Sequence, residues 1–598
     1  MDRAPGECDR TNAGIEVKYV SPERRRFDIF LEASWKKSSV LTNLCFACQG
    51  ANCFEKHPRM FNHHPPSKPD STVAVRLAVL VICTLFTLAY TYRAGGFASD
   101  LGGDPDEAAH AVTSLMLHDY VDSGLGQHPM RFAKAYYADF PRVALGHYPP
   151  MYYVLAVPLL LVHTSVNTLL IFQALTLSLL AMLTFQVGCR FLKPLTAAIA
   201  SFSVVLLPIA LKLTLHVMSD ILLALFCLWA ALLWAWYLRA PSVKRALVWG
   251  GVATAAILTK GSGMGLCLVP PVATLLCGKW RLALGWSWWC AALPVVLFAG
   301  PWMLYSTGIS KEGMTQLGPW QYFLQAVPFH LAAMPAVFGW PFTLLCAGGI
   351  VRAIINSRRD EALLPETASL AGMVLGMSLV LLLVPVGLST RYMLTLAPVV
   401  MLAAAYGLEA VPWPRSVRPA FGACLHLVFL ALFLFERGLP VKEVLGFTQA
   451  VEKLGVPKAG DSKQNWLIAS DPRGEGAVIA AAAFHCPQRS PSLLRIYRGS
   501  KELASSDWMG RDYQSQFADE AALLRHLDEL QITRVMVDLS VPAAKRMKHE
   551  QLLGAAMQSA PGLWTLDFEQ SITRQPGETG RLQAYKRSVS STTGKAPD

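Results

Sequence analysis

Long apolar runs occupy most of the chain between residues 73 and 436, and they constrain its fold more than any other feature. A helix needs about 20 apolar residues to cross the hydrocarbon core of a bilayer. On that rule we expect about eleven membrane-spanning helices, at 73–92, 167–189, 195–213, 219–238, 245–260, 262–277, 283–305, 330–352, 368–387, 393–411 and 419–436. The run 152–163 is shorter and follows Pro149–Pro150, so we expect an interfacial or re-entrant helix there.

The charge of the chain fits the same interpretation. Only 16% of the residues are charged, against roughly 25% in soluble proteins. The net charge of +12 does not indicate nucleic acid, because an excess of Lys and Arg is typical of cytoplasmic loops in multi-pass proteins and no basic-aromatic RNA motif is present.

Lys and Arg recur in every second connection between the expected spans, which assigns that side to the cytoplasm. These connections are the N-terminal tail and the segments 190–193, 239–245, 279–281, 352–359 and 415–418. The long loop 93–166, the turns at Asp220, Lys260 and Arg391, and the loop 306–329 then face the outside. The C-terminal region from residue 438 falls on that outer side too.

Three regions follow from this pattern. Residues 1–71 are polar and irregular, and we expect a disordered cytoplasmic tail, with Met60 as an alternative start. Cys45, Cys48 and Cys53 near His57 resemble a sparse zinc site, but their spacing is irregular. Residues 72–437 form the expected membrane domain, with the outer loop 93–166.

Residues 438–598 are expected to be an extracytoplasmic soluble domain. Strand-like runs at 466–470 and 535–539 flank a helical stretch at 520–530. That order indicates an α/β or α+β module. No catalytic motif stands out in it, and its only cysteine, Cys486, excludes an internal disulfide.

The outer loop 93–166 carries the most chemistry. It contains Asp104-Pro105-Asp106-Glu107, then His110, and later the run His147-Tyr148-Pro149-Pro150-Met151-Tyr152-Tyr153. A helix that starts at Pro105 places Asp106 and His110 on one face. Asp106 would then be a general base or a ligand of a divalent cation. A helix start alone also explains these residues, with Asp104 as the N-cap and Glu107 in a capping box.

Three charged residues at the outer ends of spans are further candidates. Asp220 is either a functional acid or, with Ser219, an N-cap. Lys260 is either a ligand-binding cation or a lysine at a helix C-terminus that extends to the membrane surface. Arg391, next to Tyr392, would oppose the dipole of the helix that it starts. Cations and acids on one side favour an anionic ligand such as a phosphate.

Taken together, these segments resemble the polytopic glycosyltransferases of the C-type fold, in particular the protein mannosyltransferase and lipid A aminoarabinose transferase superfamily. The resemblance covers about residues 73–411. Its motifs are an Asp-Glu early in the first outer loop, a Pro-Pro-x-x-Tyr run, an Asp at the start of a span, a Thr-Lys-Gly after a span and an Arg-Tyr before a late span.

The resemblance implies an enzyme of the cell envelope, a multi-pass protein of the inner (plasma) membrane. It would transfer a sugar, with inversion, from a polyprenyl-phosphate donor to a glycan, lipid or protein acceptor at the outer face. Asp106 would be the general base, Glu107 its motif neighbour and Asp220 a second acid. Lys260 and Arg391 would hold the lipid phosphate, and Tyr152 and Tyr153 would pack beside the site.

Some assignments stay open at this point. The acid pair is followed by Ala-Ala-His where the family often has Arg-Tyr, which leaves the donor open and His110 unassigned. We include His110, His147 and Tyr392 among the substrate-binding candidates. No cofactor is implied, although a divalent metal is compatible with the acids. The alternatives are a polytopic transporter of an anionic lipid or sugar, and a membrane-anchored scaffold that acts through residues 438–598.

Overall fold

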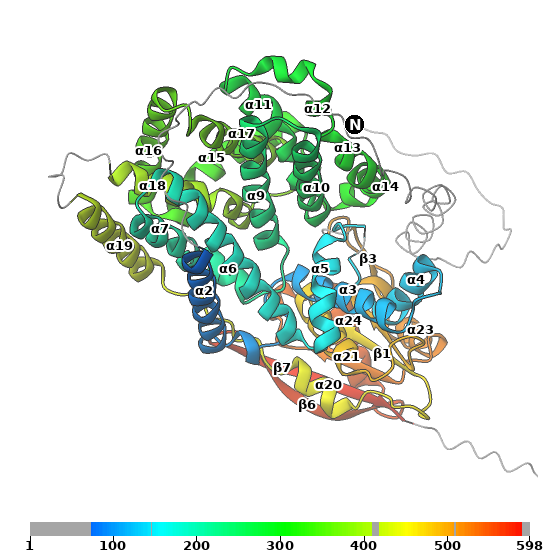
Figure 1. The fold of residues 1–598 in the computed structure, drawn as a ribbon. Helices are drawn as coiled ribbons and strands as arrows, with labels where there is room; N and C mark the ends of the chain where they lie inside the picture. The colour runs from blue at the N-terminus through cyan, green and yellow to red at the C-terminus, as the bar shows by residue number, and fades with distance from the viewer. Residues whose placement is uncertain (1–72, 145, 410–417, 508–509, 589–598) are drawn as a thin grey trace, which may run out of the picture. The chain divides into compact units, whose positions relative to one another are not determined.

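The structure, a computed structural model, describes residues 73–588 except 145, 410–417 and 508–509 (Figure 1). The expected tail 1–71 and its cysteine cluster lie outside the described residues.

Seven helical stretches in the described part of the chain are long and apolar enough to cross a membrane. They are α2 (Val73–Arg93), α6 (Val166–Phe191), α9 (Asp220–Arg239), the stretch Trp286–Gly313, α17 (Leu364–Leu383), the stretch Thr390–Leu408 formed by η6 (Thr390–Leu396) and α18 (Ala397–Leu408), and α19 (Arg418–Arg437). Each coincides with an expected span.

The expected spans 195–213 and 330–352 are bent pairs of helices. The second pair already begins at Pro319, so the expectation of a loop over 306–329 is wrong for residues 319–329. The chain turns by 58° between α7 (Pro194–Leu206) and α8 (Pro208–Thr214), and by 107° between α15 (Pro319–Phe338) and α16 (Trp340–Arg359). Pro208 explains the first break, because proline disfavours a helical conformation in the residue before it. Gly339 makes the second break with a φ of 84°, a backbone conformation that suits glycine.

The last two expected spans form shorter elements, α10 (Val243–Thr259) and η2 with α11 (Gly261–Leu268 and Val269–Leu276). At 1.5 Å per residue α10 is about 26 Å long, slightly less than a hydrocarbon core of about 30 Å. The length test alone therefore finds at most nine spans where the sequence predicts about eleven.

Contacts favour a crossing by both short elements. The segment η2–α11 packs antiparallel along α17: a Cβ on Gly376 would lie 2.0 Å from the Gly265 oxygen, and one on Gly372 would lie 3.0 Å from Val269 Cα. Glycines four apart allow such close packing between spans. At the end of this segment, Lys279 Nζ donates to the Leu238 oxygen near the end of α9 (2.7 Å). The segment therefore runs from the Lys260 end of the bundle to its opposite end.

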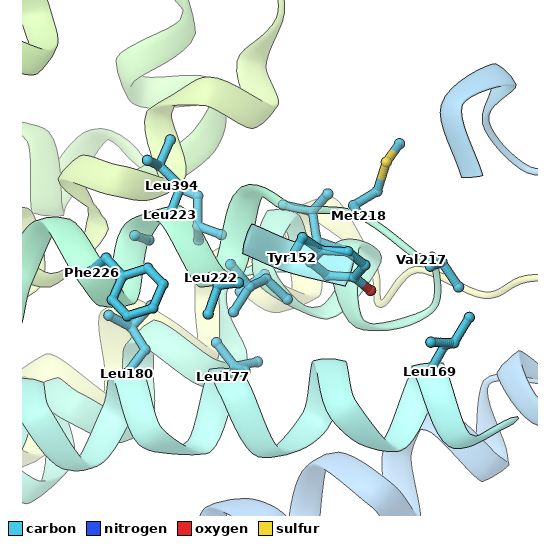
Figure 2. Close-up of a cluster of buried hydrophobic side chains, with 14 of the residues drawn as sticks. Tyr152, Leu169, Leu177, Leu180, Val217, Met218, Leu222, Leu223, Phe226 and Leu394 are labelled. Carbon is cyan, nitrogen blue, oxygen red and sulfur yellow. The ribbon is translucent and has the colours of Figure 1, made fainter. Parts of the chain in front are cut away.

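The core of the membrane part is built from α6, α9 and η6. In Figure 2, Leu177 and Leu180 of α6 lie close to Leu222 and Phe226 of α9, Leu169 lies further along α6, and Leu394 of η6 lies beside Leu223 of α9. Figure 2 also shows Val217 and Met218 in the turn that leads into α9, with the Tyr152 ring beside Met218. This packing fixes the turn that presents Asp220.

The loop between α2 and α6 is mostly helical. It contains α3 (Pro105–Asp122), α4 (Pro129–Asp139) and α5 (Met151–Val162). The twelve residues of α5 are apolar but too few to cross, as expected for the run 152–163.

Residues after α19 form a mixed five-stranded sheet in the order β2-β1-β5-β7-β6. The strands are β1 (Gln464–Ala469), β2 (Leu494–Arg498), β5 (Arg534–Asp538), β6 (Trp564–Gln575) and β7 (Glu578–Arg587), and β3 (Ala504–Ser505) pairs separately with β4 (Gln514–Ser515). β2, β1 and β5 are parallel, whereas β7 and β6 are antiparallel. The helices of this part are α20 (Phe447–Leu454), α21 (Pro472–His485), α22 (Gly499–Glu502), α23 (Glu520–Glu529) and α24 (Lys548–Ser559). The strand–helix–strand order expected from the sequence is confirmed at β1, α23 and β5.

The C-terminal part lies on the same side of the membrane segments as the loop 93–166. The hydroxyl of Tyr90 near the end of α2 donates to the Pro440 oxygen after α19, and the Lys442 N–H donates to the Ala94 oxygen (2.9 Å). Two ion pairs join the same two parts, Arg489 with Asp119 (2.6 Å) and Arg495 with Asp139 (3.1 Å).

We predict that a protease site inserted after Leu125, which is 69% exposed, and one inserted after Gly577 in the β6–β7 turn are cut from the same side of sealed vesicles. A site after Gly278 should be cut only from the other side, because α11 runs to the opposite end of the bundle. Immunoblotting of the fragments measures this. Cleavage at Gly278 and Leu125 from one side would contradict the placement of these two segments at opposite ends of the bundle.

Candidate active site

Five charged side chains from four separate segments meet at one end of the bundle. Arg391 of η6 lies 2.8 Å from Asp106 and 3.4 Å from Asp104, both at the start of α3. Lys260, directly after α10, lies 2.6 Å from Asp220, the first residue of α9. The structure therefore brings together the acids and cations that the sequence singled out.

Tyr392 connects the two groups of charges. The Lys260 ammonium lies 4.6 Å from the centre of its ring, and the Arg391 guanidinium lies 5.4 Å from it. A cation over an aromatic face is attracted by the negative face of the ring. Tyr392 thus keeps both cations on one surface.

The start of α3 only partly follows the expected helix cap. Asp104 is the N-cap and accepts from the Asp106 N–H (3.0 Å), with Pro105 at the first helical position. Glu107 does not close a capping box on Asp104, because its carboxylate accepts instead from the Gly103 N–H (3.1 Å). Its other oxygen pairs with Lys442.

Asp220 forms an ion pair with Lys260 at the start of α9. Ser219 makes no side-chain hydrogen bond to the start of this helix, so the structure does not support the alternative of a side-chain cap. The turn before Asp220 is fixed by Gln173 of α6, whose Nε2 donates to the oxygens of His216 (2.9 Å) and Met218 (2.5 Å). Gln173 carries no charge and lies inside an apolar run, so nothing in the sequence indicated this role.

An aromatic wall lies beside the acids. The Tyr148 hydroxyl donates to Asp106 Oδ2 (2.8 Å), a contact that the sequence did not indicate although Tyr148 lies in the run 147–153. His110 Nδ1 hydrogen-bonds the Tyr153 hydroxyl (3.1 Å), and its ring centre lies 5.7 Å from that of Tyr152. His147 lies in the preceding turn, where its N–H donates to the Ala144 oxygen (3.1 Å). The roles of these side chains remain predictions.

Burial and charge set different pKa values for the two acids of α3. Burial raises the pKa of Asp106, but the Arg391 charge and hydrogen bonds from Arg391 and Tyr148 bring it below its usual value. Burial and the neighbouring Asp106 charge raise the pKa of Asp104 above its usual value. Asp106 is therefore the acid that stays ionised most easily.

His110 is neutral at physiological pH, because burial lowers its pKa to about 4 against the influence of Asp106. A neutral imidazole offers one donor and one acceptor. It therefore lines the site without adding charge.

Arg391 and the two α3 acids are the more exposed members of the cluster. The side chains of Arg391, Asp106 and Asp104 are 17%, 21% and 32% exposed, whereas Asp220 is 5% exposed. A ligand would therefore meet Arg391 and the α3 acids first.

The acids of the site are paired with cations rather than grouped with one another. No group of three or more His, Cys, Asp or Glu side chains within the described ranges is arranged to hold one. Asp104 and Asp106 are both engaged by Arg391.

We predict that His110 makes stability fall in mild acid. His110 faces Asp106, Asp220, Lys260 and Arg391. Between pH 6.5 and about 4 His110 is protonated in the unfolded chain but stays neutral in the folded protein. The free energy of unfolding therefore falls by an amount on the order of 3 kcal/mol over this range, at about 1.4 kcal/mol per pH unit. Thermal unfolding in detergent across this range should show a shallower decline for His110→Gln than for the wild type. Equal slopes would contradict a neutral, buried His110.

No protein-family model matches the chain, and no curated protein is significantly similar to it. Among solved structures, it is similar to the oligosaccharyltransferase of Archaeoglobus fulgidus in complex with zinc and sulfate, at 12% identity over 77% of this chain and 67% of that chain, with a TM-score of 0.46. It is also similar to ArnT from Cupriavidus metallidurans bound to undecaprenyl phosphate, at 15% identity over 69% of this chain and 75% of that chain, with a TM-score of 0.40.

A third similar structure is archaeal AglB from Archaeoglobus fulgidus with an inhibitory peptide and a dolichol-phosphate, at 12% identity over 77% of this chain and 69% of that chain, with a TM-score of 0.43. At such identities and TM-scores the likeness carries no argument about chemistry, which rests on the contacts described above.

Proposed function

We propose that this protein is a membrane glycosyltransferase that moves a sugar from a polyprenyl-phosphate donor to an acceptor hydroxyl at the outer face of the plasma membrane. The observation that carries the proposal is the shared, partly exposed Arg391, which pairs with Asp106 and lies beside Tyr392 and Lys260. A base and two phosphate-binding cations are thus within reach of one reacting centre.

An apolar cavity of about 310 Å³ supports a lipid donor. It is lined by Val327, His330, Leu331 and Met334 of α15, Ser378, Leu381 and Leu382 of α17, and Met393 and Leu396 of η6. Met393 follows Arg391 by two residues, so their Cα atoms lie within about 7 Å by chain reach. The site therefore suits an anionic headgroup with a hydrocarbon tail.

The proposed reaction uses these groups in the following way. The donor phosphate attracts Arg391 and Lys260, and Arg391 releases Asp106. Asp106 then takes the proton of the acceptor hydroxyl, whose oxygen bonds to the sugar carbon from the face opposite the phosphate. The bond between the carbon and the phosphate oxygen breaks with its electron pair, and the two cations stabilise the lipid phosphate that leaves. The sugar is inverted at that carbon.

The other residues of the cluster have supporting roles in this proposal. Asp220 keeps Lys260 in place, and Tyr148 orients the Asp106 carboxylate. Tyr152 and Tyr153 pack behind His110. Glu107 is bonded to Gly103 and Lys442, so we assign it no contact with substrate.

A transporter is the weaker candidate. Transporters place charged sites near the bilayer midplane, often on broken helices. Here Asp220 begins α9 and Lys260 follows α10, so the charges lie at span ends beside the loop 93–166.

We predict that Asp106→Asn lowers transfer by about 10²–10⁴-fold, because general-base catalysis contributes that much. Purified protein is supplied with polyprenyl-phosphate sugars, and released lipid phosphate and glycan product are measured together. Asp122→Asn, an exposed acid at the far end of the same helix, is the control and should keep full activity. Full activity of Asp106→Asn would overturn its assignment as the base. Flux without glycan product in proteoliposomes would favour the transporter.

We predict that Arg391→Lys, which keeps the charge but loses the planar fork between two oxygens, lowers kcat roughly tenfold or more. Lys260→Met should instead raise the donor KM, because it removes one cation from the phosphate. Steady-state kinetics against donor concentration separates the two effects. The assignment of both cations fails if each variant keeps wild-type kcat and KM.

A further inference from the structure

The segment that follows α19 binds the start of the outer loop. We call residues 440–448 the strap. Two of its backbone carbonyl oxygens accept hydrogen bonds from the outer loop. Ser99 Oγ donates to the Lys442 oxygen (2.9 Å), and the Asp100 N–H donates to the Val444 oxygen (2.7 Å). The Asp100 carboxylate in turn accepts from the Phe447 N–H (2.8 Å). The strap thus lies against the residues that lead into α3.

One charged side chain of the strap enters the protein interior. Lys442 Nζ pairs with Glu107 Oε1, and the two side chains are 2% and 0% exposed. The other Glu107 oxygen accepts from the Gly103 N–H. A buried charge without its partner strongly destabilises the folded protein. The Glu107 carboxylate therefore stays where it pairs with Lys442.

This ion pair adjoins the proposed base. Glu107 follows Asp106 in the first turn of α3, and Gly103 closes that turn from the other side. A Cβ on Gly103 would lie 2.4 Å from His216 Nε2, so the turn is packed against the segment that leads to Asp220. A shift at Glu107 would therefore move Asp106 relative to both Arg391 and Asp220.

We propose that Lys442 is a positioning residue for the reaction: through Glu107 it holds Asp106 at the distance and angle that proton transfer needs. The inference rests on the proposed function of Asp106. It makes the segment after the last span part of the catalytic machinery, although Lys442 itself touches no substrate.

The helix α3 offers a matched control at its other end. Arg489 donates two hydrogen bonds to Asp119 (2.6 and 2.8 Å), so this ion pair also joins α3 to the C-terminal part. Asp119 lies twelve residues from Glu107 along the helix, about 18 Å away. Removal of either pair should lower the thermal unfolding midpoint, but only the Lys442 pair adjoins Asp106.

The test compares two double variants that remove both charges of each pair, so that no unpaired charge remains: Lys442→Met with Glu107→Gln, and Arg489→Met with Asp119→Asn. We expect the first to lower kcat about 30- to 100-fold, the scale of a misplacement of about 1 Å, while the donor KM changes less than about threefold. The second should keep kcat within about threefold of wild type. Equal losses of kcat in both variants, or unchanged kcat in the first, would overturn the proposal.

A second measurement does not depend on catalysis. Hydrogen exchange of the backbone amides in residues 99–110 should accelerate in the Lys442 variant and remain near wild type in the Arg489 variant. If the wild type transfers no sugar from any lipid phosphate, the proposed function fails, while hydrogen exchange still reports whether Lys442 holds this turn. Unchanged exchange in the Lys442 variant refutes the positioning role whatever the reaction is.

Discussion

The contact of Arg391 with Asp106 and Asp104 determines how the rest of the site is arranged. Two carboxylates at the start of one helix repel each other, and partial burial makes that repulsion stronger. Arg391 offsets it from a different segment of the chain, and Lys260 does the same for Asp220. Arg391 and Lys260 each pair with an acid from a different segment. The ends of α3, α9, α10 and η6 that carry these charges must therefore lie together.

The cluster holds two cations against three carboxylates, and this arrangement suggests how it would respond to a substrate. In the proposed reaction a phosphate competes with the carboxylates for the same guanidinium, so donor binding would release Asp106 in the same step. In such an enzyme the proposed base, Asp106, would stay paired with Arg391 and accept a proton poorly until the donor binds. In the resting site Asp106 Oδ2 already accepts hydrogen bonds from Arg391 and Tyr148.

Features that depend on local sequence were predictable. Apolar run length located most of the long helices but assigned the start of α15 (Pro319–Phe338) to a loop. Loop charge placed Asp106, Asp220, Lys260 and Arg391 at one end of the bundle. The length rule was less reliable around Lys260. There a tight turn separates α10 from η2–α11, and η2–α11 packs lengthwise on α17. Long-range pairing was not predictable: Glu107 and Lys442 are 335 residues apart, and Tyr148 reaches Asp106 only because α3 and α5 fold together. The sequence therefore marked Glu107 as a neighbour of the base and could not show that it is an anchor.

The fastening of the strap to Ala94, Ser99 and Asp100 has a consequence for biosynthesis. During synthesis the start of α3 leaves the ribosome more than three hundred residues before its buried partner. Until Lys442 is made, Glu107 has no counter-charge, and the first turn of α3 lacks one of its supports. The site is thus completed only after the last span has been inserted, so a chain that stops before the strap would insert its helices without finishing the site.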